Sequence, residues 1–237
     1  MDHEHTPEAI RHRLSGGPRQ SYLRDWIYGG IDGSVTTFAV VTGVVGAGLA
    51  PSVILILGVA NLIADGFSMA ASNYSATRTE GQELEALRIR EERHIDEYPE
   101  GEREEVRQIF AAKGLSGDDL ERVVTVITAD RTLWVKTMLA EEYGVSPHAR
   151  SALMAAACTL AAFLLCGVIP LLPFFVPIGN APAISSVATA LVFFSIGSAK
   201  SLWLTTPWWR AGLETLLIGS AAAALAYGAG VFLGGIV

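Results

Sequence analysis

Charged residues are scarce in this sequence. Asp, Glu, Lys and Arg make up 17% of its 237 residues, whereas hydrophobic residues make up 51% and the mean hydropathy is +0.38. Soluble globular domains carry about 25% charged residues, so this composition favours a membrane protein. The same figures exclude a wholly disordered, collagen-like or disulfide-stapled chain.

Basic residues and cysteines are also few. The 17 Lys and Arg residues against 24 Asp and Glu residues give a net charge of −7, and the sequence concentrates no basic patch on one face. Nucleic acid is therefore not an expected partner. Cys158 and Cys166 lie in one apolar segment. Their spacing separates them by about 12 Å along a helix, so they cannot form a disulfide bond with each other.

Five apolar segments reach the length of about twenty residues that spans a bilayer. The first twenty-five residues are polar and lack the apolar run of a secretory signal, so we expect no cleavage there. We predict five transmembrane helices, at about residues 26–49, 52–74, 149–173, 183–204 and 208–237. Between the second and third lies a charged block, about 78–150, with eleven of the basic and seventeen of the acidic residues. We expect this block to form a water-exposed domain.

The basic residues predict how the chain is oriented. They lie before the first span, between the second and third, and at Lys200 and Arg210 around the turn between the fourth and fifth. The opposite connections contain none, so the N-terminus and the acidic block are expected in the cytoplasm and the C-terminus outside. A bacterial cytoplasmic membrane is the expected host for this multi-pass protein.

Acidic side chains inside the predicted spans require a partner or a purpose, because each costs on the order of 2.5–3.5 kcal/mol on insertion scales. Asp32 lies in the first span among glycines, and Asn61, Asp65 and Met69 follow at steps of four in the second. Such steps stack an amide, a carboxylate and a thioether on one helical face. Oxygen ligands with one softer sulfur suit Fe²⁺ or Mn²⁺. The alternative is that both aspartates bond to neighbouring polar groups near the helix ends and that Met69 is core.

The charged block predicts three helices, over about 78–98, 102–112 and 116–143. Glu91 and His94 form a Glu-x-x-His step and Glu102 and Glu105 a Glu-x-x-Glu step, which place each pair over one helical turn. Carboxylate sites for iron and manganese are built on helices in this way. Acidic helix faces can also be merely solvated, and the interleaved arginines offer partners for each glutamate.

Two segments and the inserted block resemble the vacuolar iron transporter family, including its bacterial members. The segments are Asp-Trp-Ile-Tyr-Gly-Gly-Ile-Asp-Gly-Ser at 25–34 and Ala-Asn-Leu-Ile-Ala-Asp-Gly-Phe-Ser-Met-Ala-Ala-Ser-Asn-Tyr at 60–74. The resemblance implies a homodimer that moves Fe²⁺ or Mn²⁺ out of the cytoplasm in exchange for protons, with the path at the dimer interface. It implies that Asp25, Asp32 and Met69 match path residues, and that Glu91, Glu102, Glu105, Met138 and Glu142 match metal-collecting positions. His94 departs from the glutamate expected in plant relatives, which adds an imidazole ligand and sensitivity to acid.

The sequence therefore predicts an all-α membrane protein with a three-helix cytoplasmic domain inserted between spans two and three. Its expected parts are a cytoplasmic segment (1–24), spans one and two (25–77), an acidic metal-binding domain (78–148) and spans three to five (149–237). The expected ligands are divalent metal ions, protons and membrane lipid, without a prosthetic group. The transport path is expected to contain Asp25, Asp32, Asn61, Asp65 and Met69, and the metal-binding domain Glu80, Glu83, Glu91, His94, Glu102, Glu105, Met138, Glu141 and Glu142.

Other functions account for less of the sequence. A membrane-anchored metal sensor without transport would keep the acidic block but leaves Asn61, Asp65 and Met69 unexplained. A transporter selective for another divalent metal would use nearly the same ligands. An intramembrane aspartyl protease would need a Gly-x-Gly-Asp step, but Ile31 precedes Asp32. We therefore expect a transporter rather than an enzyme.

Overall fold

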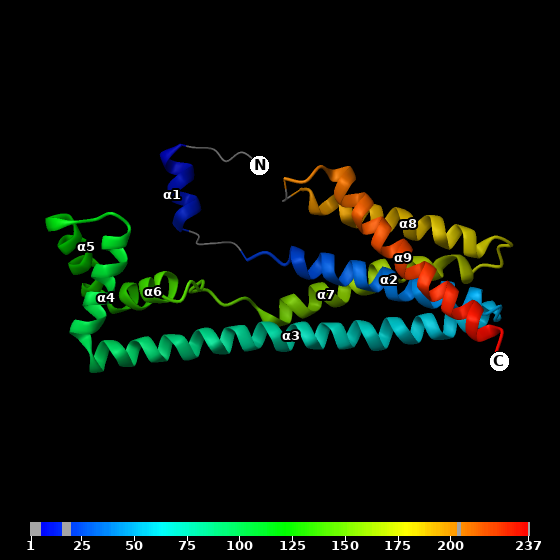
Figure 1. The fold of residues 1–237 in the computed structure, drawn as a ribbon, viewed down its shortest axis with the longest axis horizontal. Coiled ribbons are helices and arrows are strands. Elements are labelled where there is room, and N and C mark those ends of the chain that lie inside the picture. The colour runs from blue at the N-terminus through cyan, green and yellow to red at the C-terminus, as the bar shows by residue number, and fades with distance from the viewer. Residues whose placement is uncertain (1–5, 16–19, 203–204, 237) are drawn as a thin grey trace. The chain divides into compact units, whose positions relative to one another are not determined.

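The protein is helical throughout the part that the structure describes. The computed structural model describes residues 6–15, 20–202 and 205–236, which contain α-helices, one 3-10 helix and no strand (Figure 1). In chain order the elements are α1 (Pro7–Ser15), α2 (Leu23–Gly46), α3 (Pro51–Glu97), α4 (Pro99–Ala112), α5 (Gly117–Ala129), α6 (Arg131–Glu141), α7 (Ala152–Gly167), η1 (Ile169–Phe174), α8 (Ala181–Lys200) and α9 (Trp208–Gly234).

Five of these segments are long and apolar enough to cross a membrane, which confirms the prediction of five spans. They are α2, the first part of α3, α7 with η1, α8 and α9. The predicted ends of the fourth and fifth spans, at residues 204 and 237, lie outside the described residues, as do residues 1–5 and 16–19 of the predicted N-terminal segment. Helix α1, within that segment, was not predicted.

The chain forms two compact units. One, here called the membrane unit, comprises the chain up to Tyr74 and from Leu153 onward, and the other, the acidic unit, comprises Ser75–Ala152. The single helix α3 contributes its first half to the membrane unit and its second half to the acidic unit. No Gly or Pro interrupts the charged part of α3 between Gln82 and Tyr98, so the helix continues past the apolar segment.

Backbone contacts at glycine bring the helices of the membrane unit close together. A Cβ atom on Gly33 of α2 would lie 2.4 Å from the carbonyl oxygen of Phe163 in α7, and one on Gly29 would lie 2.3 Å from that of Thr159. Such small-residue contacts are typical of helix packing in membranes. Phe163 itself is completely buried in the apolar core of this unit. The glycines beside Asp32 therefore serve the close approach of α7.

The third span is shorter than predicted and has two parts. The expected helix over 149–173 begins at Ala152, and the α-helix ends at Gly167. The 3-10 helix η1 follows and contains Pro170 and Pro173. Proline has no N–H to donate, so it disrupts the hydrogen bonding of an α-helix. Cys158 and Cys166, both in α7, are free thiols as predicted.

The prediction of a single helix over about 116–143 is wrong, because the structure divides this segment into α5 and α6. The backbone of Asp130 is extended, with φ −112° and ψ 108°, and its carboxylate accepts hydrogen bonds from the N–H groups of Thr132 at 2.8 Å and Leu133 at 3.2 Å. This N-cap satisfies two donors that α6 would otherwise leave open. Together with the end of α3, helices α4, α5 and α6 enclose an apolar core that includes Val106, Trp134 and Met138.

Candidate metal sites

Three predicted ligands meet in the acidic unit. Glu91 and His94 lie one turn apart near the end of α3, and Glu102 lies in the first turn of α4, which begins two residues after α3 ends. His94 Nδ1 is 3.4 Å from Glu102 Oε1 and 3.9 Å from Glu91 Oε1. The three side chains each offer one ligand atom, and these atoms lie within 4.8 Å of one another. The group, here called the acidic cluster, has the size of a metal site.

Without a cation, burial of the carboxylates in the acidic cluster is electrostatically unfavourable. Glu91 is 0% exposed and Glu102 is 4% exposed. Each has one buried carboxylate oxygen, Oε2, without a hydrogen-bond partner among the described residues. Burial, and then the neighbouring charges of Glu105, Glu91 and Glu142, raise the pKa of Glu102 from 4.5 to about 7. A divalent cation would supply the missing opposite charge.

Tyr143 is a part of this site that the sequence did not predict. Its hydroxyl donates a hydrogen bond of 2.8 Å to Glu91 Oε1. Burial and the bond to Glu91 raise the pKa of the Tyr143 phenol, so it remains a donor at neutral pH. Tyr143 lies 52 residues beyond Glu91 and just after α6, so only the tertiary fold brings the two together. The hydroxyl fixes one oxygen of Glu91 and leaves the other open.

Two further predicted ligands, Glu105 and Glu142, add negative charge around the acidic cluster. Both are exposed. Partial burial of its carboxyl group, followed by the charges of Glu91 and Glu105, raises the pKa of Glu142, although the nearby Tyr143 hydroxyl opposes this. These carboxylates strengthen the attraction for a cation.

Four predicted ligands do not join the acidic cluster. Met138 is buried in the apolar core, and Glu141 forms an ion pair with Lys113. Glu80 and Glu83 are exposed on α3, about 16 and 12 Å along the helix axis from Glu91 at 1.5 Å per residue. Among the described residues, only three of the predicted ligands therefore lie together in the acidic cluster.

In the membrane unit, Asp32 and Met69 share a cavity. It has a volume of about 550 Å³ and is lined by Asp32 on α2, Met69 on α3 and Lys200 on α8, together with Ile27, Tyr28 and Ile31. A carboxylate and a thioether on one cavity match the predicted mixture of hard and soft ligands. Asn61 and Asp65 do not line this cavity. Of the three residues on this helical face, Met69 thus lines the cavity and the other two do not.

Asn61 and Asp65 bond to each other. The Asn61 amide donates to the Asp65 carboxylate, and the Thr37 hydroxyl donates to Asn61 Oδ1 at 3.5 Å. This pairing of polar neighbours fits the alternative in which Asp65 is satisfied locally, although the Asp65 side chain is exposed and accessible to an ion.

Asp25 lies in a buried polar network. Its Oδ1 accepts a hydrogen bond of 2.9 Å from the Asn73 amide, which also donates to the Thr159 hydroxyl at 2.7 Å. The Asp25 residue is 6% exposed. These bonds join α2, α3 and α7, so Asp25 has a structural role in addition to any role in the path.

Comparison with known proteins identifies the family. A model described as "VIT family" matches residues 23–231, which include both groups of candidate residues. The chain belongs to the VIT family. It is similar to a vacuolar iron transporter of Centaurea cyanus, with 35% identity over 210 residues, 87% of this chain and 85% of the relative. It is also similar to vacuolar iron transporter 1 of Eucalyptus grandis, with 31% identity over 209 residues, which cover 87% of this chain and 84% of the relative. Vacuolar iron transporter 1 of Arabidopsis thaliana is 32% identical over 208 residues, which cover 86% of this chain and 83% of the relative.

Membership of the VIT family confirms the predicted resemblance. The relatives are named as transporters, so the protein is a transporter rather than an enzyme. Its five apolar helices make it a multi-pass membrane protein.

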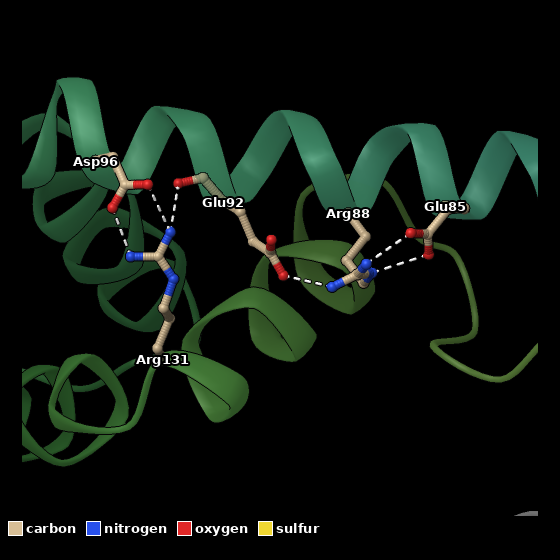
Figure 2. A network of polar contacts seen from close by, with 5 residues as sticks. All are labelled: Glu85, Arg88, Glu92, Asp96 and Arg131. Carbon is tan, nitrogen blue, oxygen red and sulfur yellow. Dashed lines mark hydrogen bonds and ion pairs between the residues drawn. The ribbon is translucent and has the colours of Figure 1, made fainter.

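In this VIT-family chain, other carboxylates of the acidic unit are neutralised by arginine. Figure 2 shows Arg88 between Glu85, at 2.6 Å, and Glu92, at 2.5 Å, on one face of α3. Arg131, the first residue of α6, bonds to both oxygens of Asp96, at 2.5 and 2.8 Å, and to the backbone oxygen of Glu92 at 2.8 Å. These arginine-paired carboxylates differ from those of the acidic cluster, where His94 is the basic partner.

Proposed function

We propose that this protein transports iron, as Fe²⁺, across a membrane, and that it also accepts Mn²⁺. The relatives are named iron transporters. The observation that carries the proposal is the acidic cluster, in which two buried carboxylates and an imidazole converge. Carboxylate and imidazole ligands together suit Fe²⁺ and Mn²⁺, whereas Mg²⁺ and Ca²⁺ prefer oxygen ligands alone.

The acidic unit would collect the ion. Glu91 and Glu102 would each give an oxygen and His94 a nitrogen, with Glu105 and Glu142 concentrating cations around them. Glu80, Glu83, Met138 and Glu141 were predicted to share this role. Exposed Glu80 and Glu83 can attract cations at longer range, while Met138 and Glu141 would have to leave the apolar core and the ion pair with Lys113.

The membrane unit would carry the ion across. The cavity supplies one carboxylate from Asp32 and one thioether from Met69, and the remaining coordination sites of the metal would keep water. Asp25, Asn61 and Asp65 are the other proposed members of the path. The proposed direction is out of the cytoplasm, with the N-terminus and the domain over 78–148 in the cytoplasm, the C-terminus outside, and a bacterial cytoplasmic membrane as host.

Proton antiport follows from the chemistry of the release step. When a divalent ion leaves the Asp32 carboxylate, the site must neutralise or stabilise the remaining charge in an apolar environment. Uptake of a proton from the side that receives the metal accomplishes this and returns the transporter to its starting state. Metal would then leave in exchange for protons.

The proposed assembly is a homodimer surrounded by lipid. In the isolated chain, α3 of the membrane unit exposes Ile56, Ile63 and Phe67 by 65 to 69%. Lipid tails or a second copy of the chain would cover such apolar side chains. We propose that the path lies at the interface between the two copies.

Metal uptake into proteoliposomes that contain a pH-sensitive dye tests the function. Fe²⁺ and Mn²⁺ are compared for the wild type and for Asp32→Ala. We expect uptake with a matching proton flux, and loss of both in the variant. Metal binding without any flux would contradict transport and support the sensor. Unchanged uptake by Asp32→Ala would contradict the assigned path.

A further inference from the structure

A lysine shares the cavity with the proposed metal ligands. Lys200 is the last residue of α8, and its side chain lines the same cavity as Asp32 and Met69. Among the described residues of this lining, Asp32 is the only acidic one and Lys200 the only basic one. A positive charge in a cation path opposes the entry of a cation, so its presence there requires a reason.

The ammonium group of Lys200 is held by a neutral partner. Its Nζ donates a hydrogen bond of 3.2 Å to the hydroxyl of Thr215 on α9, and that hydroxyl in turn donates to the carbonyl oxygen of Ala211 at 3.2 Å. Thr215 is 2% exposed. Its hydroxyl proton is therefore engaged, and its lone pairs face the lysine.

Close packing fixes the Thr215 hydroxyl in place. Helices α8 and α9 lie side by side (Figure 1). A Cβ atom on Gly197 of α8 would come within 2.6 Å of Thr215 Oγ1. The glycine leaves room for the hydroxyl at the crossing. The structure thus provides a rigid resting position for the ammonium group.

Asp32 is the other position available to this ammonium group. No ion pair within 4.0 Å joins Asp32 and Lys200 among the described residues, although both line one cavity. The four-carbon stem of lysine is flexible, so the ammonium group can move from Thr215 toward Asp32 by rotation about its own bonds. The Asp32 carboxylate is half-buried and is repelled by the charge of Asp65, so a nearby positive charge stabilises it and favours that movement.

We propose that Lys200 is the exchangeable counter-ion of Asp32. When neither metal nor the exchanged proton occupies Asp32, the ammonium group compensates its carboxylate; when a divalent cation binds there, the ammonium group rests on Thr215. This inference rests on the proposed transport path through Asp32. Lys200 competes with the metal for one carboxylate, so it weakens metal binding and speeds release.

The competition also favours divalent over monovalent cations. A monovalent ion brings no more charge to Asp32 than the ammonium group that it must displace, whereas a divalent ion brings twice as much. Lys200 is therefore a specificity-determining residue for the transport reaction. Sodium ions would gain little at Asp32 while Lys200 is present.

Mn²⁺ uptake by the full chain in proteoliposomes tests the exchange. For Lys200→Leu, which removes the charge without adding a ligand atom, we expect KM to fall about tenfold or more, because Asp32 loses its competing partner. We expect kcat to fall as well, because release slows, and Na⁺ to inhibit uptake in this variant but not in the wild type. Lys200→Arg retains the charge that competes for Asp32, so its KM should not fall below that of the wild type.

Thr215→Val should change KM in the opposite direction. The substitution keeps the shape of the side chain and removes the resting position of the ammonium group, so Lys200 stays with Asp32 and KM rises. A purely structural role for Lys200 or Thr215 does not predict opposite changes in KM. If Lys200→Leu does not fold, as judged by size-exclusion and thermal unfolding, Lys200→Ala replaces it with the same expected direction.

An unchanged or raised KM in a folded Lys200→Leu or Lys200→Ala variant would overturn the inference. Asp32→Asn separates this failure from failure of the proposed function. If Asp32→Asn transports at the wild-type rate, the path through Asp32 is wrong. If it is inactive while the Lys200 variants keep the wild-type KM, the path stands and the counter-ion role is wrong.

Discussion

Glu102 couples metal binding in the acidic unit to pH. Its pKa lies at about 7, above the ordinary 4.5, because the carboxyl group is buried among other carboxylates. Metal binds the deprotonated form, so we predict that the dissociation constant for Mn²⁺ rises as pH falls below 7, by up to about tenfold per pH unit. Titration of the full chain in detergent, at several pH values, measures this. Glu102→Gln should make the profile between pH 5 and 7 less steep, and a flat wild-type profile would contradict the assignment.

The same shift has a defined sign for stability without metal. Between about pH 4.5 and pH 7 the unfolded chain has lost the Glu102 proton while the folded chain retains it. The contribution of Glu102 to the free energy of unfolding therefore decreases as pH rises through this window, and is constant below it. Added metal should reverse the trend, because binding favours the deprotonated folded state.

Tyr143 positions Glu91 through its hydroxyl. Tyr143→Phe removes the 2.8 Å hydrogen bond and leaves a second buried oxygen of Glu91 without a donor. We predict that the Mn²⁺ dissociation constant rises about tenfold, a typical cost of removing a group that orients a ligand. Binding to the full chain, followed by the paramagnetic resonance of free Mn²⁺, measures the change. Tyr98→Phe, at an exposed ring of the same unit, is the matched control and should bind as the wild type.

Residue spacing predicted that Glu91 and His94 lie together, but it could not predict the contacts that Glu102 and Tyr143 make with them. The step from Glu91 to His94 is fixed by helical geometry, so the sequence could pair them. Glu102 was predicted as a ligand, but its approach to His94 depends on how α4 follows α3. Tyr143 could not be found, because no local pattern links it to Glu91. The binding roles themselves stay predictions.

At the scale of elements, the contact between α2 and α7 depends on the absence of a side chain at Gly33. Gly33→Ala would place a Cβ atom 2.4 Å from the Phe163 carbonyl oxygen, and this backbone atom can yield only if the helices move apart. We predict a loss of about 1–3 kcal/mol in the free energy of unfolding, the usual cost of overpacking. Unfolding of the protein in mixed micelles measures it.

Gly228→Ala is the control for this helix contact. Gly228 is also helical, in α9, and a Cβ atom there would meet nothing within 4 Å. The substitution should leave stability unchanged or raise it slightly, because alanine has the higher helix propensity. Equal losses at Gly33 and Gly228 would show that the α2 and α7 contact is not the cause.

Helix ends were harder to predict than helices. The break at Asp130 has neither Gly nor Pro, and its only local signal is an aspartate that can cap the next helix. The surrounding residues keep the apolar periodicity of a helix, so their pattern continues across the break. In the third span the prolines were visible, but a 3-10 helix accommodated them at the end of an apolar segment that is long enough to span.

For the whole molecule, the two units should affect different kinetic constants. Glu91→Gln combined with Glu102→Gln removes the buried charge that collects metal, but leaves the cavity with Asp32 and Met69. We predict that KM for Mn²⁺ uptake rises about tenfold or more, whereas kcat at saturating metal stays within about twofold. Initial uptake rates into proteoliposomes over a range of Mn²⁺ concentrations measure both.

Glu80→Gln combined with Glu83→Gln is the charge-matched control. Both residues are exposed and lie outside the acidic cluster. The control should raise KM less than the buried pair does. An equal rise would indicate that general negative charge, rather than the acidic cluster, collects the ion.

Hydropathy predicted the five spans because bilayer thickness sets a length that composition reveals directly. It could not predict that α3 continues as one helix into the acidic unit, since the apolar segment ends near Tyr74 while the helix ends at Glu97. The sequence also could not predict that Asp32, Met69 and Lys200 line one cavity, because this depends on the packing of three helices.

The acidic unit contains its own optical probe. Trp134 is its only tryptophan and is 3% exposed, and its indole N–H has no hydrogen-bond partner among the described residues. The guanidinium carbon of Arg103, the residue after Glu102, lies 5.6 Å from the centre of the indole ring. Fluorescence from this ring should be blue-shifted, and a paramagnetic ion bound next to Glu102 should quench it. Occupancy of the site can thus be followed by light emission in the unlabelled protein.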